Sequence, residues 1–269
     1  MPDSGQVHFE VRGAIAQIIF DRPGARNAMT WSMYAALKKI CAELQERPDV
    51  RVAIFRGAGG EAFVSGTDIS QFLEFKDGDD GVRYEALIDA HVSAMETLPM
   101  PTIAVIEGLA IGGGLVMAAA CDFRLSTPGA RFGLPIAKTV GNCLSMANVT
   151  RLANQIGLAN LNRMLLAARL LTAEELAPTG FVEQIVAPNE IATAADALAL
   201  RLSALAPITQ RVSKAGIRRW VQSGLHDTRL WNSDQKDGSD LVRAAYASQD
   251  FKEGVAAFTQ RRTPVWKGK

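Results

Sequence analysis

Two glycine-led turns hold the residues of this chain that are best suited to chemistry. Gly112, Gly113 and Gly114 follow an apolar run at residues 102–106, which predicts a buried strand, and they open a short apolar helix that runs to Ala120. Such a turn directs backbone N–H groups and the positive end of a helix at an anionic group. A phosphate, a developing oxyanion, or a close-packed neighbour without any ligand would each suit it.

A second turn of the same kind lies at residues 65–69, where Ser-Gly-Thr-Asp-Ile follows a strand and is expected to open a helix. Two N–H groups from two such turns, if they converge on one point, would form an oxyanion hole for a thioester or ester carbonyl. Glycine suits this task because a residue without Cβ lets a substrate carbonyl approach the backbone closely. Spacing alone leaves tight helix–strand packing as the alternative.

Several common catalytic patterns are missing from the sequence. Residues 108–114 do not form G-x-G-x-x-G, and neither a P-loop nor a G-x-S-x-G elbow occurs. The histidines His8, His91 and His226 are far apart in the sequence, and no ligand spacing indicates a metal site. The 3 cysteines are scattered, which favours a reducing compartment over a disulfide framework.

The composition describes an ordinary globular protein. Of the 269 residues 48% are hydrophobic and 21% are charged, which is enough for a sizeable core. The formal net charge of +1 gives no support to nucleic-acid binding or to binding at a membrane surface. We find no pattern of a signal peptide and no uncharged apolar run of about 18 residues, so we expect a cytoplasmic protein.

The elements that must position the two turns predict an α/β chain. Residues 7–11 and 15–20 predict a β-hairpin, and residues 52–55 predict a further buried strand. Thr30 can cap the helix between them. Strand, helix and strand in this order predict a parallel βαβ unit. The expected buried face of that helix consists of Trp31, Tyr34, Leu37, Cys41 and Leu44.

The rest of the chain is expected to become increasingly helical. The acidic, glycine-rich residues 76–81 predict a mobile loop. A helix then leads to the strand at residues 102–106, and from about Gly141 onward helical patterns dominate. No linker divides the chain into independent domains. The buried face of the helix before residue 102 is expected to consist of Tyr84, Leu87, Ile88, His91, Met95 and Leu98.

The sequence resembles the crotonase (enoyl-CoA hydratase/isomerase) family over nearly its whole length. No single motif is specific, but together they are. The residues that carry the resemblance are Asp21-Arg22-Pro23 through Arg26-Asn27-Ala28, Phe63-Val64-Ser65-Gly66-Thr67-Asp68-Ile69, Pro101 through Ile111-Gly112-Gly113-Gly114, Cys121-Asp122, Arg131-Phe132-Gly133-Leu134-Pro135, and Phe251-Lys252-Glu253-Gly254 through Phe258.

The resemblance implies a fold and a substrate class. The family's fold is a spiral of ββα units, here expected at residues 1–200, with a helical C-terminal region at residues 201–269 that makes trimers, often paired into hexamers. The substrate is an acyl-coenzyme A thioester, so coenzyme A enters as part of the substrate and not as a permanent cofactor. Its carbonyl oxygen would accept hydrogen bonds from the amides of Thr67 and Gly113.

The same resemblance implies which residues contact the substrate. Residues near Arg26, Ser65 and Asp68 would lie against the adenine and pantetheine, whereas Phe258 and Arg261 match positions that reach coenzyme A near a subunit boundary. The implied binding residues are Ala25, Arg26, Ala28, Ser65, Asp68, Ile69, Leu109, Ile111, Val116, Pro135, Ile136, Leu144, Phe258 and Arg261.

One departure from the family pattern bears on the chemistry. Hydratases of the family use two glutamates, and the matching positions hold Val116 and Ile136 in this chain. Adding water across a double bond needs a base for the water and an acid for Cα, and neither side chain can serve. An isomerase that keeps only the second glutamate is excluded by the same Ile136. The two apolar residues hint at a hydrophobic or aromatic acyl group.

Replacements for the missing acid and base are few. Cys143 occupies the position where some relatives carry a nucleophilic aspartate, but no adjacent cation would lower its pKa, and packing is the alternative. Asn142 and Ser145 could orient a water molecule or cap a helix, and His91 could be a general base or a core histidine. Asp68 is expected to cap the helix at Ile69. A binder of acyl-CoA without activity and a thioesterase or acyl transferase using Cys143 therefore stay open as alternatives.

Overall fold

The computed structural model describes residues 5–226 and 239–265 and contains two β-sheets. The first sheet has the order β1-β2-β3-β5-β7-β10, and the second has the order β4-β6-β8-β9. The strands of the first are β1 (Gln6–Arg12), β2 (Ile15–Asp21), β3 (Val52–Gly57), β5 (Thr102–Ile106), β7 (Phe123–Ser126) and β10 (Gln184–Ile185). Those of the second are β4 (Ala62–Val64), β6 (Leu109–Ile111), β8 (Arg131–Gly133) and β9 (Leu170–Thr172).

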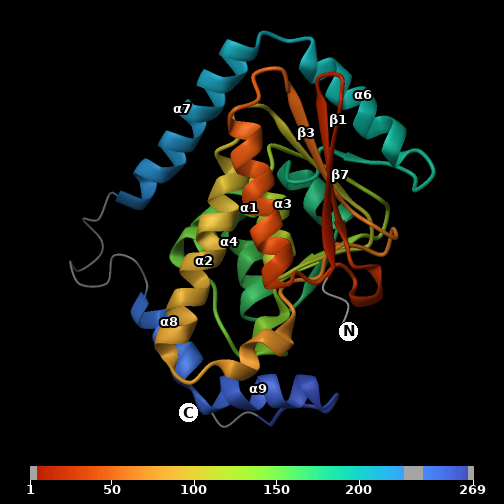
Figure 1. Cartoon of the computed structure of the whole chain (residues 1–269). Coiled ribbons are helices and arrows are strands. Elements are labelled where there is room, and N and C mark those ends of the chain that lie inside the picture. The colour runs from red at the N-terminus through yellow and green to blue at the C-terminus, as the bar shows by residue number, and fades with distance from the viewer. Residues whose placement is uncertain (1–4, 227–238, 266–269) are drawn as a thin grey trace.

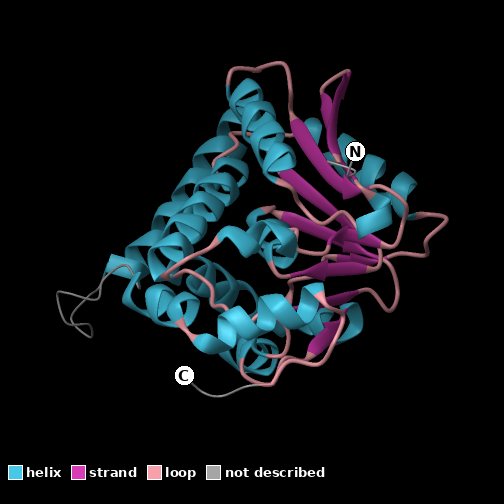
Figure 2. Ribbon diagram, turned by 60° about the horizontal axis from the view of Figure 1, so that its bottom comes forward, coloured by secondary structure: helices cyan, strands magenta, loops and turns pink. Residues whose placement is uncertain are grey.

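Helices connect and cover these strands, and the end of the chain is helical, as the sequence predicts (Figure 1). Figure 2 shows the strands in magenta with helices on both sides of them. The helices are α1 (Trp31–Gln45), α2 (Gly78–Glu96), α3 (Gly113–Ala120), α4 (Met146–Leu165), α5 (Ala173–Leu176), α6 (Ile191–Ser203), α7 (Pro207–His226), α8 (Ser239–Ala247) and α9 (Gln249–Thr259). Short 3-10 turns lie at Pro23–Ala25, Ile69–Glu74, Pro135–Ala137 and Ala177–Thr179.

The first part of the chain folds as its pattern predicts. Strands β1 and β2 form the antiparallel hairpin, and β2 pairs in parallel with β3, which completes the βαβ unit around α1. Thr30 caps α1 by accepting a hydrogen bond from the Met33 amide. Of the expected buried face of α1, Tyr34 and Leu37 are buried, whereas Trp31 is 37% exposed.

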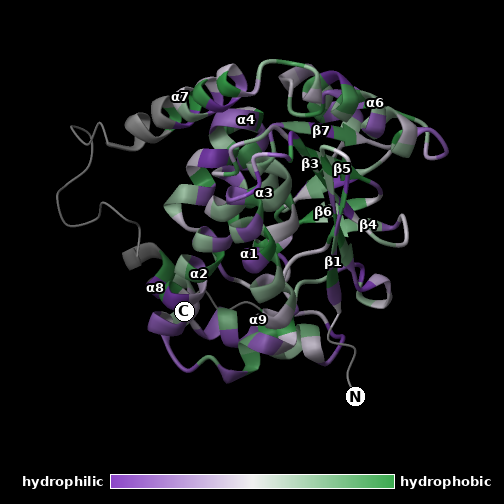
Figure 3. Ribbon diagram, turned by 45° about the horizontal axis from the view of Figure 1, so that its top comes forward, coloured by the Kyte–Doolittle hydropathy of each residue, from purple (hydrophilic) through white to green (hydrophobic). Residues whose placement is uncertain are grey.

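Buried apolar side chains on the two faces of the first sheet form two separate hydrophobic clusters. The strand side chains on one face pack against α6, with Ile54 and Val105 beside Ala195. Those on the other face join the larger core, which α1, α2, α3 and α4 complete. Figure 3 shows the hydrophobic colour concentrated on β3, β5, β6 and α3. Helix α3 is therefore enclosed in the core. Its N-terminus is accessible only through the space between the neighbouring turns.

The expectation of a mobile loop at residues 76–81 is wrong. Helix α2 already begins at Gly78, because Asp77 accepts hydrogen bonds from the amides of Asp79 and Asp80, while the Asp80 carboxylate accepts one from the Asp77 amide in return. The acidic residues thus form a capping box at the positive end of the helix. Arg243 of α8 also pairs with Asp79 at 2.6 Å, which ties this end of α2 to the C-terminal helices.

The buried face of α2 also differs from the expected one. Leu87, expected inside, is 41% exposed, whereas Glu85 is only 4% exposed. Since Gly81, Ile88 and Val92 are buried as well, Glu85 lies on a regular helical stripe of buried positions. A carboxyl group therefore enters the core from α2.

Among the described residues, no single helix combines the length and apolar character needed to cross a membrane. The pair Ile191–Ser203 and Pro207–Arg218 meets the criterion only when both helices are taken together, and the pair is bent by 103°.

Candidate active site between helices α2 and α3

The two glycine-led turns lie directly against each other. Gly112 has φ 56° and Gly66 has φ 106°, a region of backbone conformation that glycine tolerates and other residues rarely adopt. A Cβ atom on Gly112 would lie 3.7 Å from Cα of Gly66, and one on Gly66 would lie 3.5 Å from the carbonyl oxygen of Ile111. The two turns that the sequence singles out therefore lie side by side in the fold.

The amides of Thr67 and Gly113 both lack a hydrogen-bond acceptor in the part of the chain that the structure describes. Thr67 forms a parallel bridge with Met29, in which the Met29 amide donates to the Gly66 carbonyl and the Asp68 amide donates to the Met29 carbonyl. The N–H of Thr67 itself therefore points away from Met29. Gly113 is the first residue of α3, where amides have no partner within the helix.

A chain of hydroxyl groups fixes Thr67. Its Oγ1 lies 2.8 Å from the Tyr34 hydroxyl and 2.7 Å from the Tyr84 hydroxyl. Burial raises the pKa of both tyrosines, so these hydroxyls keep their protons. The ideal Cβ position of Gly113 is 4.0 Å from Thr67 Oγ1, which brings the two amide-bearing residues next to one another.

Asp68 caps the turn that follows Thr67, as predicted. Its Oδ1 accepts a hydrogen bond of 3.0 Å from the Ser70 amide, and its Oδ2 pairs with Arg22 Nη1 at 2.7 Å. Although burial acts to raise it, the hydrogen bonds from Ser70 and Arg22 lower the pKa of Asp68. The carboxylate is thus engaged by the cap and by Arg22.

A pocket of about 90 Å³ opens between the two turns, helix α2 and the residues before α4. Val116 and Ile136, where the family resemblance leads us to expect glutamates in a hydratase, both line it. The pocket wall on that side is therefore apolar. The predicted site residues that line the pocket are Ser65, Thr67, Ile69, Ile111, Gly113, Val116, Pro135, Ile136, Asn142 and Leu144.

The other predicted binding residues do not line this pocket. The carbonyl oxygens of Ala25 and Arg26 accept hydrogen bonds of 3.3 and 3.2 Å from Ser65, and the Ala28 carbonyl accepts one from Arg22. The backbone of this segment therefore supports the turn at residues 65–69, on the side away from the pocket. Leu109 and Asp68 lie outside the pocket lining as well, as do Phe258, which is 52% exposed on α9, and Arg261.

Cys143 and His91 gain no support as catalytic groups, because neither lines the pocket. Burial raises the pKa of Cys143 to about 12, which keeps its sulfur as a thiol at neutral pH. The His91 ring packs on Tyr34 with 5.2 Å between centroids, and its Nδ1 lies 2.6 Å from the Leu87 carbonyl oxygen, to which it donates. Within the described residues, no group of acidic, histidine and cysteine side chains could hold a metal ion.

The sequence analysis missed Glu85, which lines this pocket. The hydroxyl of Tyr246 on α8 donates a hydrogen bond of 2.9 Å to Oε1, and the Ser145 amide donates one of 3.0 Å to Oε2. Burial raises the pKa of Glu85 to about 8, although these two hydrogen bonds act to lower it. The spacing of Gly81, Glu85, Ile88 and Val92 was the signal that could have revealed it.

Asn142 also faces this part of the pocket. Its Nδ2 donates a hydrogen bond of 3.1 Å to the Tyr246 hydroxyl, whereas its buried Oδ1 has no partner among the residues that the structure describes. Asn142 does not cap α4, because Ser145 fills that role by accepting from the Asn148 amide. A buried amide oxygen without a donor is rare in a folded protein and calls for an explanation.

A second polar network holds the segment before α4 against α2. Asp89 accepts hydrogen bonds of 2.7 Å from the Ser145 hydroxyl and 2.9 Å from Asn148 Nδ2. Arg151 donates to Asn148 Oδ1 and pairs with Glu96 at 3.0 Å. Glu85 and Asp89, one helical turn apart on α2, thus both hold Ser145, whereas Glu96 contacts only Arg151 of α4.

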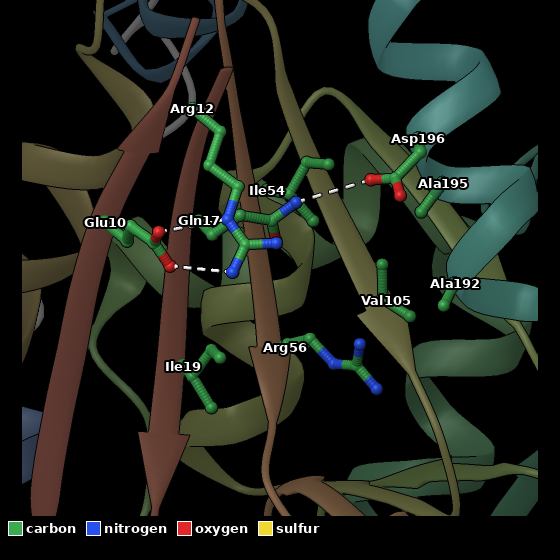
Figure 4. A pocket seen from close by; sticks show the side chains of 10 residues that line it. All are labelled: Glu10, Arg12, Gln17, Ile19, Ile54, Arg56, Val105, Ala192, Ala195 and Asp196. Atoms are coloured by element: carbon green, nitrogen blue, oxygen red, sulfur yellow. Dashed lines mark hydrogen bonds and ion pairs between the residues drawn. The ribbon is translucent and has the colours of Figure 1, made fainter.

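A different hollow, of about 330 Å³, lies on the outer face of the first sheet beside α6 (Figure 4). Of its charged side chains, Arg12 pairs with Glu10 at 2.9 Å and Arg56 pairs with Glu107 at 3.0 Å. Asp196 is exposed and accepts a hydrogen bond of 3.4 Å from Gln17. The hollow presents neither unpartnered amides nor a buried acid, so we place the chemistry at the pocket between α2 and α3.

Comparisons with known proteins identify the family and the fold. The family model for enoyl-CoA hydratase/isomerase matches residues 10–269. An (E)-benzylidenesuccinyl-CoA hydratase from Thauera aromatica is 30% identical over 276 residues, covering 97% of this chain and 99% of that protein. A short-chain-enoyl-CoA hydratase from Clostridium acetobutylicum is 28% identical over 256 residues, with 95% of each chain covered. The fold is like that of methylmalonyl-CoA decarboxylase in complex with 2-nitronate-propionyl-CoA, with a TM-score of 0.87 at 23% identity and 98% of each chain covered.

Proposed function

The chain belongs to the enoyl-CoA hydratase/isomerase family, and we propose that it is an acyl-CoA lyase or isomerase whose reaction passes through a thioester enolate. The observation that carries the proposal is that Thr67 and Gly113 line one small pocket and that neither amide has an acceptor within the described ranges 5–226 and 239–265. In this proposal the thioester carbonyl oxygen accepts a hydrogen bond from each amide. Negative charge that develops on that oxygen is then met by donors already in place, which lowers the barrier to enolate formation.

Val116 and Ile136 support a reaction that differs from hydration by two glutamates. Neither side chain can take or give a proton, and both contact the pocket where an acyl group would lie. The pocket of about 90 Å³ has room for a few water molecules, which favours a short acyl group. We therefore propose that a short, apolar acyl chain is the natural occupant.

The remaining expectations extend this proposal. Coenzyme A is part of the substrate, and Ser65 and Ile69 at the pocket contact its pantetheine. Residues 1–200 form the catalytic unit, and residues 201–269 make contacts in a homotrimer or a dimer of trimers. Phe258 is 52% exposed on α9, which suits a residue that meets either coenzyme A or a neighbouring subunit.

A binding comparison tests the two amides directly. Propionyl-CoA carries the thioester carbonyl, and S-propyl-CoA, a thioether, lacks that oxygen. Two net hydrogen bonds of about 1 kcal/mol each predict an affinity about 30-fold higher for the thioester. Isothermal titration calorimetry of the full chain measures both affinities.

Gly113→Pro removes one donor at a position where helices accept proline, the first residue of α3. Its matched control, Gly113→Ala, keeps the amide and adds a Cβ that meets the Tyr34 hydroxyl at 3.3 Å. We expect the proline variant to lose most of the preference for the thioester and the alanine variant to keep it. Equal affinity of the unmodified chain for both compounds would refute the oxyanion hole.

A further inference from the structure

We propose that Glu85 is the catalytic acid and base of this enzyme, moving a proton to and from Cα of the bound acyl group. The inference rests on the proposed function, since it takes the acyl-CoA thioester as the molecule in the pocket. Glu85 would supply the acid and base that Val116 and Ile136 cannot provide. Glu85 is on α2, whereas Val116 is on α3 and Ile136 is in the turn at Pro135.

The position of the carboxyl group is the first argument. Glu85 is 4% exposed and lines the same pocket as Thr67 and Gly113. Its two oxygens are held from different elements, Oε1 by the hydroxyl of Tyr246 at 2.9 Å and Oε2 by the amide of Ser145 at 3.0 Å. Among the described residues no lysine, arginine or histidine pairs with it, so the carboxyl group is held in place but its charge is not neutralised.

The protonation state is the second argument. Burial raises the pKa of Glu85 to about 8, the nearby Asp89 adds to this, and the hydrogen bonds from Tyr246 and Ser145 oppose it. At neutral pH the group is therefore mostly a carboxylic acid with an accessible carboxylate form, and a pKa near the working pH suits a residue that serves as both acid and base. The titratable groups that influence it or are influenced by it come from α1, α2, the segment before α4, and α8: Tyr34, Tyr84, Asp89, Cys143 and Tyr246.

The third argument is the unpartnered oxygen of Asn142. Its Oδ1 is buried and no described residue donates to it, and its Nδ2 donates at 3.1 Å to the Tyr246 hydroxyl, which in turn donates to Glu85. The polar end of the pocket therefore offers an unused acceptor beside the acid, where a polar group of the ligand or a water molecule can donate. Asn142 and Tyr246 act as positioning residues, because they orient the Glu85 carboxyl group.

The step balances without any further reactant. The Glu85 carboxylate takes the proton from Cα, and the electron pair of the broken C–H bond forms the Cα–C double bond. The carbonyl π electrons move onto the oxygen that the amides of Thr67 and Gly113 hold. In the reverse step protonated Glu85 returns the proton to Cα and the thioester is restored.

A purely structural role is the competing explanation, since Glu85 also ties the segment at Ser145 and helix α8 to α2. The two roles predict different results for Glu85→Gln. Glutamine keeps the size of the side chain, and its amide can still accept from the Ser145 amide and donate to the Tyr246 hydroxyl. It cannot exchange a proton with carbon. A structural role thus predicts that binding and proton exchange change together, whereas a catalytic role predicts that only exchange is lost.

The experiment measures incorporation of deuterium at Cα of propionyl-CoA in D2O by mass spectrometry, together with propionyl-CoA affinity by calorimetry. The chains compared are the unmodified protein, Glu85→Gln, Glu85→Asp and the control Glu96→Gln. Glu96 is on α2, as Glu85 is, but it lies outside the pocket, and its substitution removes the ion pair with Arg151 of α4. We expect Glu85→Gln to bind propionyl-CoA within about 3-fold of the unmodified protein but to exchange at least 100-fold more slowly, the low end of the usual contribution of a general base.

The pH profile gives a second readout. Exchange by the unmodified protein is expected to rise with pH and to level off above about 8, as the carboxylate form fills. Glu85→Asp keeps a carboxyl group and regains part of the rate, and Glu96→Gln keeps both the rate and the profile. A structural role for Glu85 would not produce this titration.

Each contrary result would contradict either the proposed function or the role of Glu85. If the unmodified protein does not bind propionyl-CoA, the proposed function fails. If it binds but does not exchange between pH 6 and 9.5, or if Glu85→Gln exchanges as fast as the unmodified protein, the assignment of Glu85 is overturned. Loss of binding together with exchange in Glu85→Gln would overturn it too, because that result shows a structural role.

Discussion

Glu85 should make the stability of this protein fall as the pH rises, and Glu85→Gln should remove that dependence. The carboxyl group is 4% exposed and has no cationic partner among the described residues, so its charged form is unfavourable in the folded state. Its pKa is about 8 in the folded chain, against an ordinary value of 4.5. Glutamine at the same position carries no charge at any pH.

The size and sign follow from these two values. Below pH 4.5 the carboxyl group is protonated in both states and favours neither. Between pH 4.5 and 8 the unfolded chain has ionised while the folded chain still holds its proton, so stability falls by about 1.4 kcal/mol for each pH unit. Over this interval the loss amounts to about 5 kcal/mol, and above about pH 8 it stays constant.

Urea unfolding of the two proteins at pH 5, 6, 7, 8 and 9, at equal protomer concentration, measures the difference. All other titrating groups contribute to both curves, so subtracting one curve from the other isolates Glu85. We expect Glu85→Gln to gain stability relative to the unmodified protein by several kcal/mol between pH 5 and 8, with no further gain at pH 9. Curves that stay parallel within about 0.5 kcal/mol would refute a buried, protonated Glu85.

Three further predictions use the same contacts. Asp89→Asn removes a charge that helps to raise the pKa of Glu85, so the midpoint of the exchange profile should move to lower pH. Tyr246→Phe removes a hydrogen bond that lowers this pKa, so the midpoint should move to higher pH, and an unchanged profile would count against the contact. Gly114→Ala places a Cβ 1.9 Å from the Val64 carbonyl oxygen, so we expect a loss of about 3 kcal/mol or more, measured as a fall in Tm of about 10 °C, and a normal Tm would contradict this close approach.

The sequence predicted most of the fold, because its strongest signals are local. The hairpin of β1 and β2 and the cap at Thr30 depend on residues that lie close together in the chain. The parallel pairing of β2 with β3 joins distant residues, but the order of strand, helix and strand predicts it. The loop expected at residues 76–81 was wrong for a local reason as well. Its acidic residues were interpreted by composition, although Asp77 and Asp80 have the spacing of a capping box.

Of the candidate site, the sequence predicted the backbone amides but not the acidic side chain. Two glycine-led turns indicated where amides could converge, and the structure brings Gly66 and Gly112 together. The acid could not be assigned in this way. Its partner Tyr246 is 161 residues away in the chain, and burial of Glu85 depends on helix α8 packing against α2. A charged residue next to Tyr84 on a predicted helix is more often exposed, and only the regular spacing with Gly81 and Ile88 argued otherwise.

The arrangement of α2 and α3 explains how one pocket can receive its acid from either side. The N-terminus of α3 fixes the amide of Gly113, and thereby where the carbonyl oxygen would lie. Residues of α2, α3 and the turn at Pro135 all reach the space beside that oxygen. If the acyl group binds there as proposed, the element that carries the carboxyl group decides from which direction the proton arrives. Because Val116 and Ile136 are apolar and Glu85 is buried beside Tyr246 and Asn142, the proposal predicts that the proton arrives from the α2 side, which fixes the face of the enolate that is protonated.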